Sequence, residues 1–319
     1  MINQTKNIRT LKGPIMIFGA GGFIGINLLQ TILKTRDDVF GVSSAPEKSW
    51  RLQKAQIPKK NIVVGNLLDK ETIRKIIKKT KPQTIFNLAA YGSYSKQKDS
   101  EKIYQTNFLA AVNLIETLKK FGFKNYLQAG SQSEYGLNSS RPSETDELIP
   151  NSHYAVSKTG CYYLIKYYGK VERLPVVHLR FYSVYGPWEE PDRLIPTLVK
   201  YAKKNQLPAF VDPEISRDFI YIDDVVEAMI LLAAKLSLKC YGEAFNIATG
   251  KKTTIKELAF LAKGIFKIKT RPVFSSMKNR NWDLKDWWGN PNKLEKEFNW
   301  QAATSLDQGL LKTFHYNDE

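Results

Sequence analysis

Short apolar runs alternate with longer amphipathic segments from residue 14 onward. The apolar runs predict strands at Ile15–Phe18, Val39–Val42, Ile62–Val64, Thr84–Leu88, Tyr126–Ala129 and Val176–Arg180. Apolar positions at the 3.6-residue spacing predict helices at Phe23–Lys34, Glu71–Lys79, Ile103–Phe121 and Tyr154–Tyr168. Strands that alternate with helices are joined by right-handed crossovers into a parallel sheet covered on both faces. The pattern therefore predicts a doubly wound α/β fold.

The pattern changes after residue 186. Prolines interrupt the following segment at Pro187, Pro191, Pro196, Pro208 and Pro213. A helix is predicted near Asp223–Lys235, and aromatic residues gather around Trp282–Trp288. We expect two domains: residues 1–186 form the doubly wound domain, and residues 187–319 form a smaller mixed α/β lobe that faces the substrate. Whether the second lobe is interleaved with the first stays open.

The composition indicates a globular chain that holds no metal. Of the 319 residues, 43% are hydrophobic, which is enough for a substantial core. Cys161 and Cys240 lie far apart, and with three histidines the chain has no cluster at metal-ligand spacing, so we expect reduced thiols and a cytoplasmic protein. The apolar stretch at 14–33 contains four glycines, which favours a buried strand and helix over a membrane segment.

The net charge of +17 admits two interpretations. A nucleic-acid partner is the sharper one, but the basic residues lie mainly in solvated helical stretches such as Arg74–Lys79, without an aromatic-interleaved patch. We therefore expect a lysine-rich surface that attracts polyanionic small ligands, and no nucleic acid.

A glycine-rich loop follows the first predicted strand. Gly19, Gly22 and Gly25 have the spacing GxxGxxG, and the helix begins at Phe23 and Ile24. Glycine lets the backbone approach a pyrophosphate, and a helix N-terminus presents free N–H groups to the anion. This context predicts a dinucleotide-binding domain of the Rossmann type.

The end of the second predicted strand bears on the choice between NAD and NADP. NAD-selective domains commonly have a carboxylate there for the ribose hydroxyls. This chain has Ser43 and Ser44, with Lys48 and Arg51 nearby. Cations without a carboxylate favour a 2′-phosphate, so we lean to NADP over NAD.

Tyr154 and Lys158 form a YxxxK pair, which a helix places on one face about a turn apart. An ammonium beside the phenol would stabilise the phenolate and make tyrosine a usable base near neutral pH. The segment Gly130–Gly136 ends a predicted strand upstream and resembles the segment that carries the catalytic hydroxyl in short-chain dehydrogenases; the resemblance implies that Ser131 is this hydroxyl. These three residues are our candidate catalytic group.

Several motifs together resemble the extended short-chain dehydrogenase/reductase family of nucleotide-sugar epimerases, dehydratases and reductases. They are the glycine spacing, the Ser131 and Tyr154 segments, Arg180–Pro187, Arg217–Val225 and Gly242–Ile247. The resemblance implies a nucleoside-diphosphate sugar as substrate. It also implies further cofactor-lining positions at Asn66, Leu67, Leu88, Ala89, Ala90, Tyr182 and Val184. Implied substrate contacts are Tyr91, Tyr94, Ser131, Gln132, Ser133, Ser183, Arg193 and Arg217, with the two arginines for the diphosphate.

The resemblance narrows the reaction. The 4,6-dehydratases of the family carry an acid–base pair directly after the catalytic hydroxyl, where this chain has Gln132 and Ser133; Glu134 lies one position further on. We therefore expect oxidoreduction at C4, as a 4-epimerase, 4-ketoreductase or 4-dehydrogenase. A 4,6-dehydratase, or a non-enzymatic dinucleotide sensor or RNA-binding relative, is the alternative. Relatives commonly dimerise through helices like Ile103–Phe121 and Tyr154–Tyr168, so we expect a homodimer.

Overall fold

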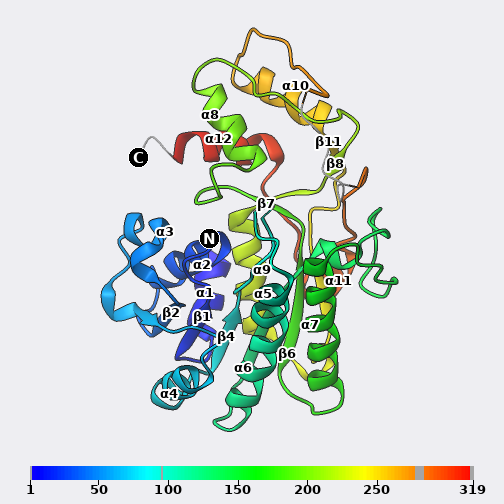
Figure 1. Ribbon diagram of the computed structural model, residues 1–319. Coiled ribbons are helices and arrows are strands. Elements are labelled where there is room, and N and C mark those ends of the chain that lie inside the picture. The colour runs from blue at the N-terminus through cyan, green and yellow to red at the C-terminus, as the bar shows by residue number, and fades with distance from the viewer. Residues whose placement is uncertain (1, 95, 277–283, 317–319) are drawn as a thin grey trace. The chain divides into compact units, whose positions relative to one another are not determined.

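The structure is a computed structural model that describes residues 2–94, 96–276 and 284–316 (Figure 1). The chain divides into two compact units that are interleaved along the sequence. Unit 1 comprises Met1–Glu134, Pro150–Arg180 and Val226–Phe245, and unit 2 comprises Tyr135–Ile149, Phe181–Val225 and Asn246–Glu319. The domains 1–186 and 187–319 remain a prediction, which differs from this division because short segments of each half of the chain belong to the other unit.

A seven-stranded sheet has the order β10-β6-β5-β4-β1-β2-β3. Its strands are β1 (Ile15–Phe18), β2 (Val39–Ser43), β3 (Ile62–Val64), β4 (Thr84–Asn87), β5 (Asn125–Ser131), β6 (Val176–Phe181) and β10 (Ala244–Ile247). The β1 strand pairs in parallel with both β2 and β4, and the pairs β2–β3 and β4–β5 are also parallel. Two small sheets pair β7 (Ser183–Tyr185) with β9 (Phe219–Tyr221), and β8 (Ser216–Arg217) with β11 (Thr253–Thr254).

The helices of the first 180 residues are α1 (Ile2–Thr10), α2 (Phe23–Leu33), α3 (Trp50–Lys54), α4 (Lys70–Thr80), α5 (Ser100–Tyr104), α6 (Ala110–Lys119) and α7 (His153–Lys170). A π-helical segment, Gln105–Leu109, joins α5 to α6. The later helices are α8 (Leu194–Ala202), α9 (Ile222–Lys235), α10 (Ile255–Ile265), α11 (Asn292–Phe298) and α12 (Leu306–Tyr316).

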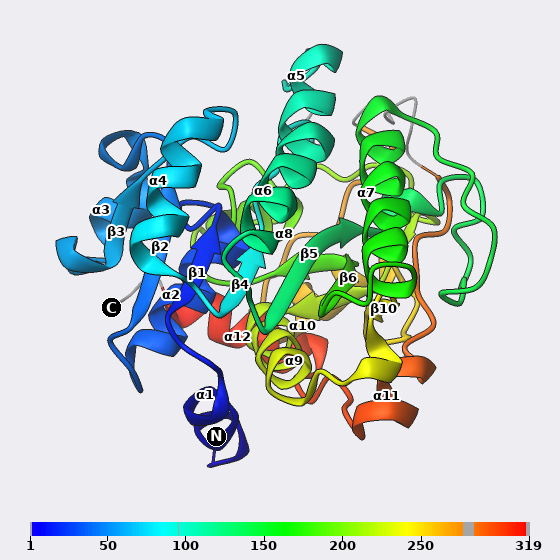
Figure 2. The ribbon, with the colours of Figure 1, turned by 90° about the horizontal axis from the view of Figure 1, so that it is seen from below.

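Helices cover both faces of the large sheet. One core cluster joins Met16, Phe18 and Val42 of the sheet to apolar residues of α4, α6 and α7. Side chains alternate between the faces of a strand. Gly41, the neighbour of Val42, accordingly approaches Leu29 of α2 on the opposite face. Figure 2 shows α4, α6 and α7 together on one side of the strands, with α9 on the other.

The predicted fold class is confirmed, and the predicted strands of unit 1 are present with shifts of a few residues at their ends. The predicted helices are present as well, but the one predicted at Ile103–Phe121 is divided into α5, the π-helical segment and α6. The helix predicted near Asp223–Lys235 is α9. Trp282, in the predicted aromatic stretch, lies outside the described residues. Within the described ranges, no helix is long and apolar enough to cross a membrane.

Candidate active site

The glycine loop lies where the strand order changes direction. Gly19 follows β1 with φ +80, and a Cβ there would lie 2.7 Å from the backbone nitrogen of Ala89, just after β4. A Cβ at Gly25 would lie 2.3 Å from the carbonyl oxygen of Gly19. Glycine at these two positions therefore permits the close approach of β1, α2 and the loop after β4. In doubly wound sheets this switch point is where ligands bind.

The start of α2 suits an anion. Gly22 is its N-cap, and within the described part of the chain no side chain caps this helix end. The first N–H groups of an α-helix have no partner within the helix, so those of the turn that begins at Phe23 and Ile24 are available to a phosphate. The residues present therefore fit the pyrophosphate of a dinucleotide.

The predicted residues at the adenosine end come from two further loops. Ser43 ends β2, and its carbonyl oxygen accepts from the Gly65 N–H at 3.0 Å, so Asn66 and Leu67 follow directly beside it. Ser49 Oγ donates to the Gly21 carbonyl oxygen at 3.3 Å, which ties the start of α3 to the glycine loop. The Ser44 side chain is exposed.

Arg51 adjoins this loop on α3. Its side chain is buried, and its guanidinium carbon lies 4.5 Å from the centroid of the Trp50 ring. The structure therefore brings a cation into the same part of unit 1 as the glycine loop, and binding of a 2′-phosphate by Arg51 stays a prediction.

The three candidate catalytic residues come from two adjoining elements. Ser131 ends β5, while Tyr154 and Lys158 lie one turn apart on α7, whose N-cap Ser152 accepts from the Ala155 N–H. Lys158 is 1% exposed and donates from Nζ to the Ala129 carbonyl oxygen at 2.9 Å. This contact ties α7 to β5 two residues before Ser131.

Lys158 and Tyr154 are placed for electrostatic coupling. The Lys158 Nζ lies 5.8 Å from the centroid of the Tyr154 ring. Burial lowers the pKa of Lys158 below its usual value. A cation this close stabilises a phenolate, which is the requirement for tyrosine to act as a base.

The residues after Ser131 differ in what their side chains contact. Ser131 Oγ and Ser133 Oγ form a hydrogen bond of 2.8 Å. The side-chain oxygen of Gln132 is buried and has no hydrogen-bond partner among the described residues. The triplet therefore offers two linked hydroxyls and an amide, and no carboxyl group.

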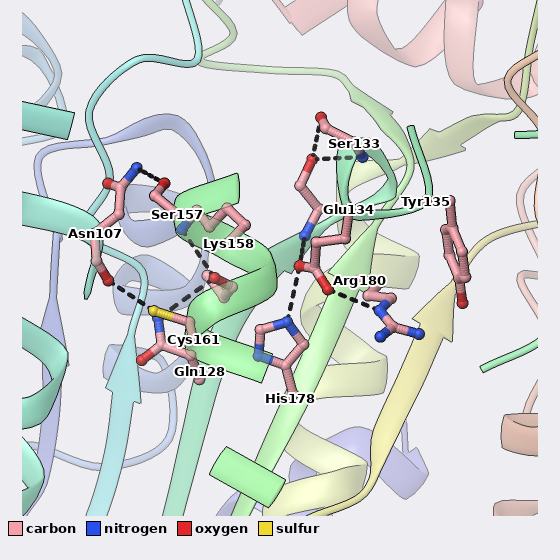
Figure 3. A network of polar contacts seen from close by, with 12 residues as sticks. Asn107, Gln128, Ser133, Glu134, Tyr135, Ser157, Lys158, Cys161, His178 and Arg180 are labelled. Atoms are coloured by element: carbon pink, nitrogen blue, oxygen red, sulfur yellow. Dashed lines mark hydrogen bonds and ion pairs between the residues drawn. The ribbon is translucent and has the colours of Figure 1, made fainter. Parts of the chain in front are cut away.

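The next residue in the chain, Glu134, has a carboxylate, which contacts His178 and Arg180 (Figure 3). The side chain is fully buried; Oε2 accepts from Arg180 Nε at 2.8 Å, and Oε1 lies 2.8 Å from His178 Nε2. Burial opposes ionisation, but the neighbouring Arg180 and the hydrogen bonds to the carboxylate hold the pKa of Glu134 below its usual range. Glu134 is therefore an ionised, paired group that has no proton to donate.

One residue with a role in this arrangement was missed by sequence reasoning. Asn107, in the π-helical segment, holds the backbone of Tyr91 by two hydrogen bonds: Oδ1 accepts from the Tyr91 N–H at 2.8 Å, and Nδ2 donates to the Tyr91 carbonyl oxygen at 2.9 Å. Nδ2 also donates to Ser157 Oγ on α7 at 2.9 Å. Its signal in the sequence is a polar residue at a position of the apolar helix face, between Ile103 and Ala110.

Tyr91 and Tyr94 lie in the loop after β4. A Cβ on the intervening Gly92 would lie 3.3 Å from the Tyr154 ring, so this loop passes beside the candidate base. The Tyr94 N–H donates to Gln97 Oε1 at 3.3 Å. The geometry brings the loop to Tyr154, the candidate base, while contact with a sugar stays a prediction.

The remaining predicted residues belong to unit 2. Ser183 and Val184 lie on β7, paired with β9, and the buried ring of Tyr182 packs over Gly289. Arg193 is the N-cap of α8, with Nε 3.6 Å from Glu189 Oε1, and Arg217 donates from an Nη to the Ser216 carbonyl oxygen. Their roles toward cofactor and substrate stay predictions. Within the described ranges, no group of three or more His, Cys, Asp or Glu could hold a metal ion.

Comparisons with known proteins agree with this fold. Protein CapI of Staphylococcus aureus is 31% identical over 93% of this chain and 96% of its own length. A UDP-glucuronate 4-epimerase of Thermodesulfobacterium geofontis is 26% identical over 96% of this chain and 97% of its own. The solved UDP-glucuronic acid 4-epimerase of Bacillus cereus, in complex with UDP-glucuronic acid and NAD, superposes with a TM-score of 0.82 at 25% identity, covering 95% of this chain and 98% of that one. The model of the NAD dependent epimerase/dehydratase family matches residues 15–248, and the chain belongs to this family.

Proposed function

We propose that the protein is an enzyme that exchanges hydride at C4 of a nucleoside-diphosphate sugar, and that its reaction is 4-epimerisation. The relatives named as UDP-glucuronate 4-epimerases align over nearly the whole chain, which supports the epimerase assignment. The alternative of a dinucleotide sensor or RNA-binding relative is not favoured, because Ser131, Tyr154 and Lys158 are all present on adjoining elements.

The observation that carries the proposal is the environment of Ser131. Dehydration needs one group to protonate a leaving hydroxyl and another to remove a proton from carbon. Gln132 and Ser133 cannot do either as a carboxyl group does, and Glu134 is paired with Arg180. Besides the hydride carrier, oxidation and reduction at C4 need a hydrogen-bond donor and a base at the C4 oxygen, roles that we assign to Ser131 and Tyr154.

The chain's own residues perform the proton steps. A nicotinamide held by the glycine loop would supply the hydride acceptor and donor for C4. Tyr154 takes the proton from the C4 hydroxyl as the carbonyl forms, and returns it as the carbonyl is reduced from the opposite face. Lys158 keeps the phenol acidic enough for this exchange, and Ser131 donates a hydrogen bond to the C4 oxygen.

The same proposal assigns the remaining residues of the site. Arg217 and Arg193 bind the diphosphate, for which a guanidinium fork is suited. The sugar is contacted by Tyr91, Tyr94, Gln132, Ser133 and Ser183. The cofactor is lined by Phe23, Ile24, Asn66, Leu67, Leu88, Ala89, Ala90, Tyr182 and Val184.

The experiment incubates the protein with UDP-glucose, UDP-glucuronate and NDP-4-keto-6-deoxyhexoses and follows the products by NMR in deuterated water. We expect a C4 epimer without solvent deuterium on carbon, because the hydride never exchanges with water. A 4-keto-6-deoxy sugar formed from an intact hexose, with deuterium at C5 or C6, would refute the proposal and show that another carboxylate acts.

A second candidate, a 4-ketoreductase that uses NADPH, is favoured by the end of β2. Ser43 and Ser44 stand where NAD-selective domains commonly carry a carboxylate, and Arg51 lies on the adjoining α3. Denaturing the purified protein and identifying the released dinucleotide separates the two candidates. Retained NAD supports the epimerase, because an epimerase regenerates its own cofactor. A protein without retained dinucleotide that binds NADPH far better than NADH, and loses that preference in Arg51→Ala, supports the reductase.

We also propose that the protein is a homodimer. On α7, Val156, Tyr163 and Tyr167 are about half exposed, and their spacing of seven and four residues places them on one helix face. Light scattering after size exclusion measures the mass. We expect Tyr163→Lys with Tyr167→Lys to halve it, while the control Phe260→Lys, at a similarly exposed aromatic of α10, leaves it unchanged.

A further inference from the structure

A buried ionic cluster adjoins Ser131 through a hydrogen bond to its backbone. It consists of Glu134, His178 and Arg180, all of which are fully buried in unit 1 (Figure 3). Burying charged groups costs free energy unless they are paired and hydrogen-bonded, so such a cluster requires a reason beyond packing. Within the segment Gly130–Gly136, Ser131 is the candidate catalytic hydroxyl, and Glu134 has no assigned role.

Glu134 holds the backbone of the catalytic hydroxyl. Its Oε1 accepts a hydrogen bond from the Ser131 N–H at 2.8 Å, three residues back in the chain. The same oxygen lies 2.8 Å from His178 Nε2, and Oε2 accepts from Arg180 Nε. The carboxylate is therefore fixed by two residues of β6 while it anchors the end of β5.

Gly130 makes this contact possible. A Cβ at this position would lie 2.2 Å from His178 Nε2 and 2.5 Å from Glu134 Oε1. The imidazole and the carboxylate therefore occupy the space that a side chain would fill.

The cluster also reaches the catalytic helix. The Arg180 guanidinium carbon lies 4.4 Å from the centroid of the Tyr162 ring. Tyr154, Lys158 and Tyr162 follow one another at four-residue intervals, so these three side chains share one face of α7. One chain of contacts thus runs from Ser131 through Glu134 and Arg180 to the helix that carries the base.

We propose that Glu134 is a positioning residue: held by His178 and Arg180, it fixes the Ser131 backbone so that the hydroxyl lies at the C4 oxygen facing Tyr154. This inference rests on the proposed function of Ser131. A misplacement of about 1 Å can cost up to roughly 100-fold in rate, so a backbone anchor of this kind has a measurable catalytic effect.

The test is a double-mutant cycle of Glu134→Gln with Ser131→Ala, assayed on the sugar that the protein turns over. We expect Glu134→Gln to lower kcat ~10- to 100-fold with KM little changed, and to have no further effect once Ser131 is alanine. Because Glu134→Gln removes the carboxylate that Arg180 Nε contacts, Glu134→Gln with Arg180→Met is prepared in parallel, in which neither charge of this ion pair remains.

A second measurement needs no substrate. Hydrogen exchange of the peptide containing residues 130–134 reports directly on the Ser131 N–H. We expect faster exchange there in both Glu134 variants than in the wild type. The matched control is Glu144→Gln, which removes a different buried carboxylate, one that accepts from the Asn246 N–H at 2.8 Å. The control is expected to leave exchange at residues 130–134 and the effect of Ser131→Ala unchanged.

The outcomes separate the two claims. Full activity in Ser131→Ala refutes the proposed role of Ser131 itself. If Ser131→Ala lowers kcat, and Glu134→Gln lowers it by the same factor in the wild type and in Ser131→Ala, the positioning role of Glu134 is refuted while the role of Ser131 stands. Unchanged exchange at residues 130–134 in the Glu134 variants overturns it as well, whatever the kinetics.

Discussion

Tyr154 and Lys158 make separable contributions that substitutions can test. Tyr154→Phe removes only the phenol oxygen that moves the proton, so kcat should fall by roughly 10²–10⁴-fold while dinucleotide binding stays nearly intact. Lys158→Met removes the buried ammonium and its hydrogen bond to the Ala129 carbonyl oxygen, so turnover, dinucleotide binding and stability should all decline. Steady-state kinetics and dinucleotide titration measure both effects. A Tyr154→Phe enzyme that keeps most of its activity would exclude this residue as the base.

The two cysteines test the packing around α7 and η5 (Leu238–Cys240). Neither cysteine forms a disulfide and both are fully buried, and burial raises the pKa of Cys161 to about 12. Since the thiolate is the reactive form, neither cysteine should react with a thiol-specific chromogenic reagent in the folded protein. Two thiols should react after denaturation. Rapid labelling of either cysteine under native conditions would contradict the burial described here.

At the scale of the element, the start of α2 requires glycine at position 25, and Gly264 of α10 provides a matched control. An alanine Cβ at Gly25 would lie 2.3 Å from the Gly19 carbonyl oxygen, whereas a Cβ at Gly264 of α10 meets no atom within 4 Å. Gly25→Ala should therefore distort the loop and sharply weaken dinucleotide binding. Gly264→Ala should leave binding unchanged and stabilise the protein by about 0.5–1 kcal/mol, because alanine is the better helix former.

Calorimetric titration with dinucleotide and urea unfolding of both variants measure these effects. Equal dinucleotide affinity in Gly25→Ala and the wild type would show that the loop has room for a side chain.

At the scale of the whole molecule, the buried cluster makes stability depend on pH. Burial lowers the pKa of His178, and the charges of Arg180 and Lys158 act in the same direction against the attraction of Glu134. Below pH 6.5, the ordinary pKa of histidine, the unfolded chain therefore binds a proton that the folded chain does not. The lowered pKa of Glu134 adds stability that is present above pH 4.5 and is lost as the pH falls through its folded-state value.

Both groups thus predict that the free energy of unfolding falls with acidification, at up to about 1.4 kcal/mol per pH unit for each proton. Urea unfolding at a series of pH values measures the slope. His178→Gln should reduce the pH dependence of the free energy of unfolding that begins near pH 6.5. His315→Gln, which replaces an exposed histidine, is the control and should not reduce it. A wild-type slope that is unaffected by His178→Gln would contradict the buried, neutral state of this residue.

The sequence alone determined the features that repeat within one element or one loop. Alternating apolar runs and amphipathic segments predicted the doubly wound sheet, because burial imposes the same spacing wherever a strand or helix packs. The Gly19 loop and the Tyr154–Lys158 pair were likewise readable, since their spacing is short and belongs to a single turn or helix face.

Only the tertiary structure decided what lies between elements. Glu134 contacts His178 and Arg180 across 44 and 46 residues, and Asn107 contacts Ser157 across 50. In the sequence, Glu134 follows one position after the two places where dehydratases of the family carry their acid–base pair. In the fold, its ionised carboxylate accepts from the Ser131 N–H. The difference arises because the register of β5 beside β6 sets which groups meet in the core, and burial then sets their charge, and no local spacing encodes either.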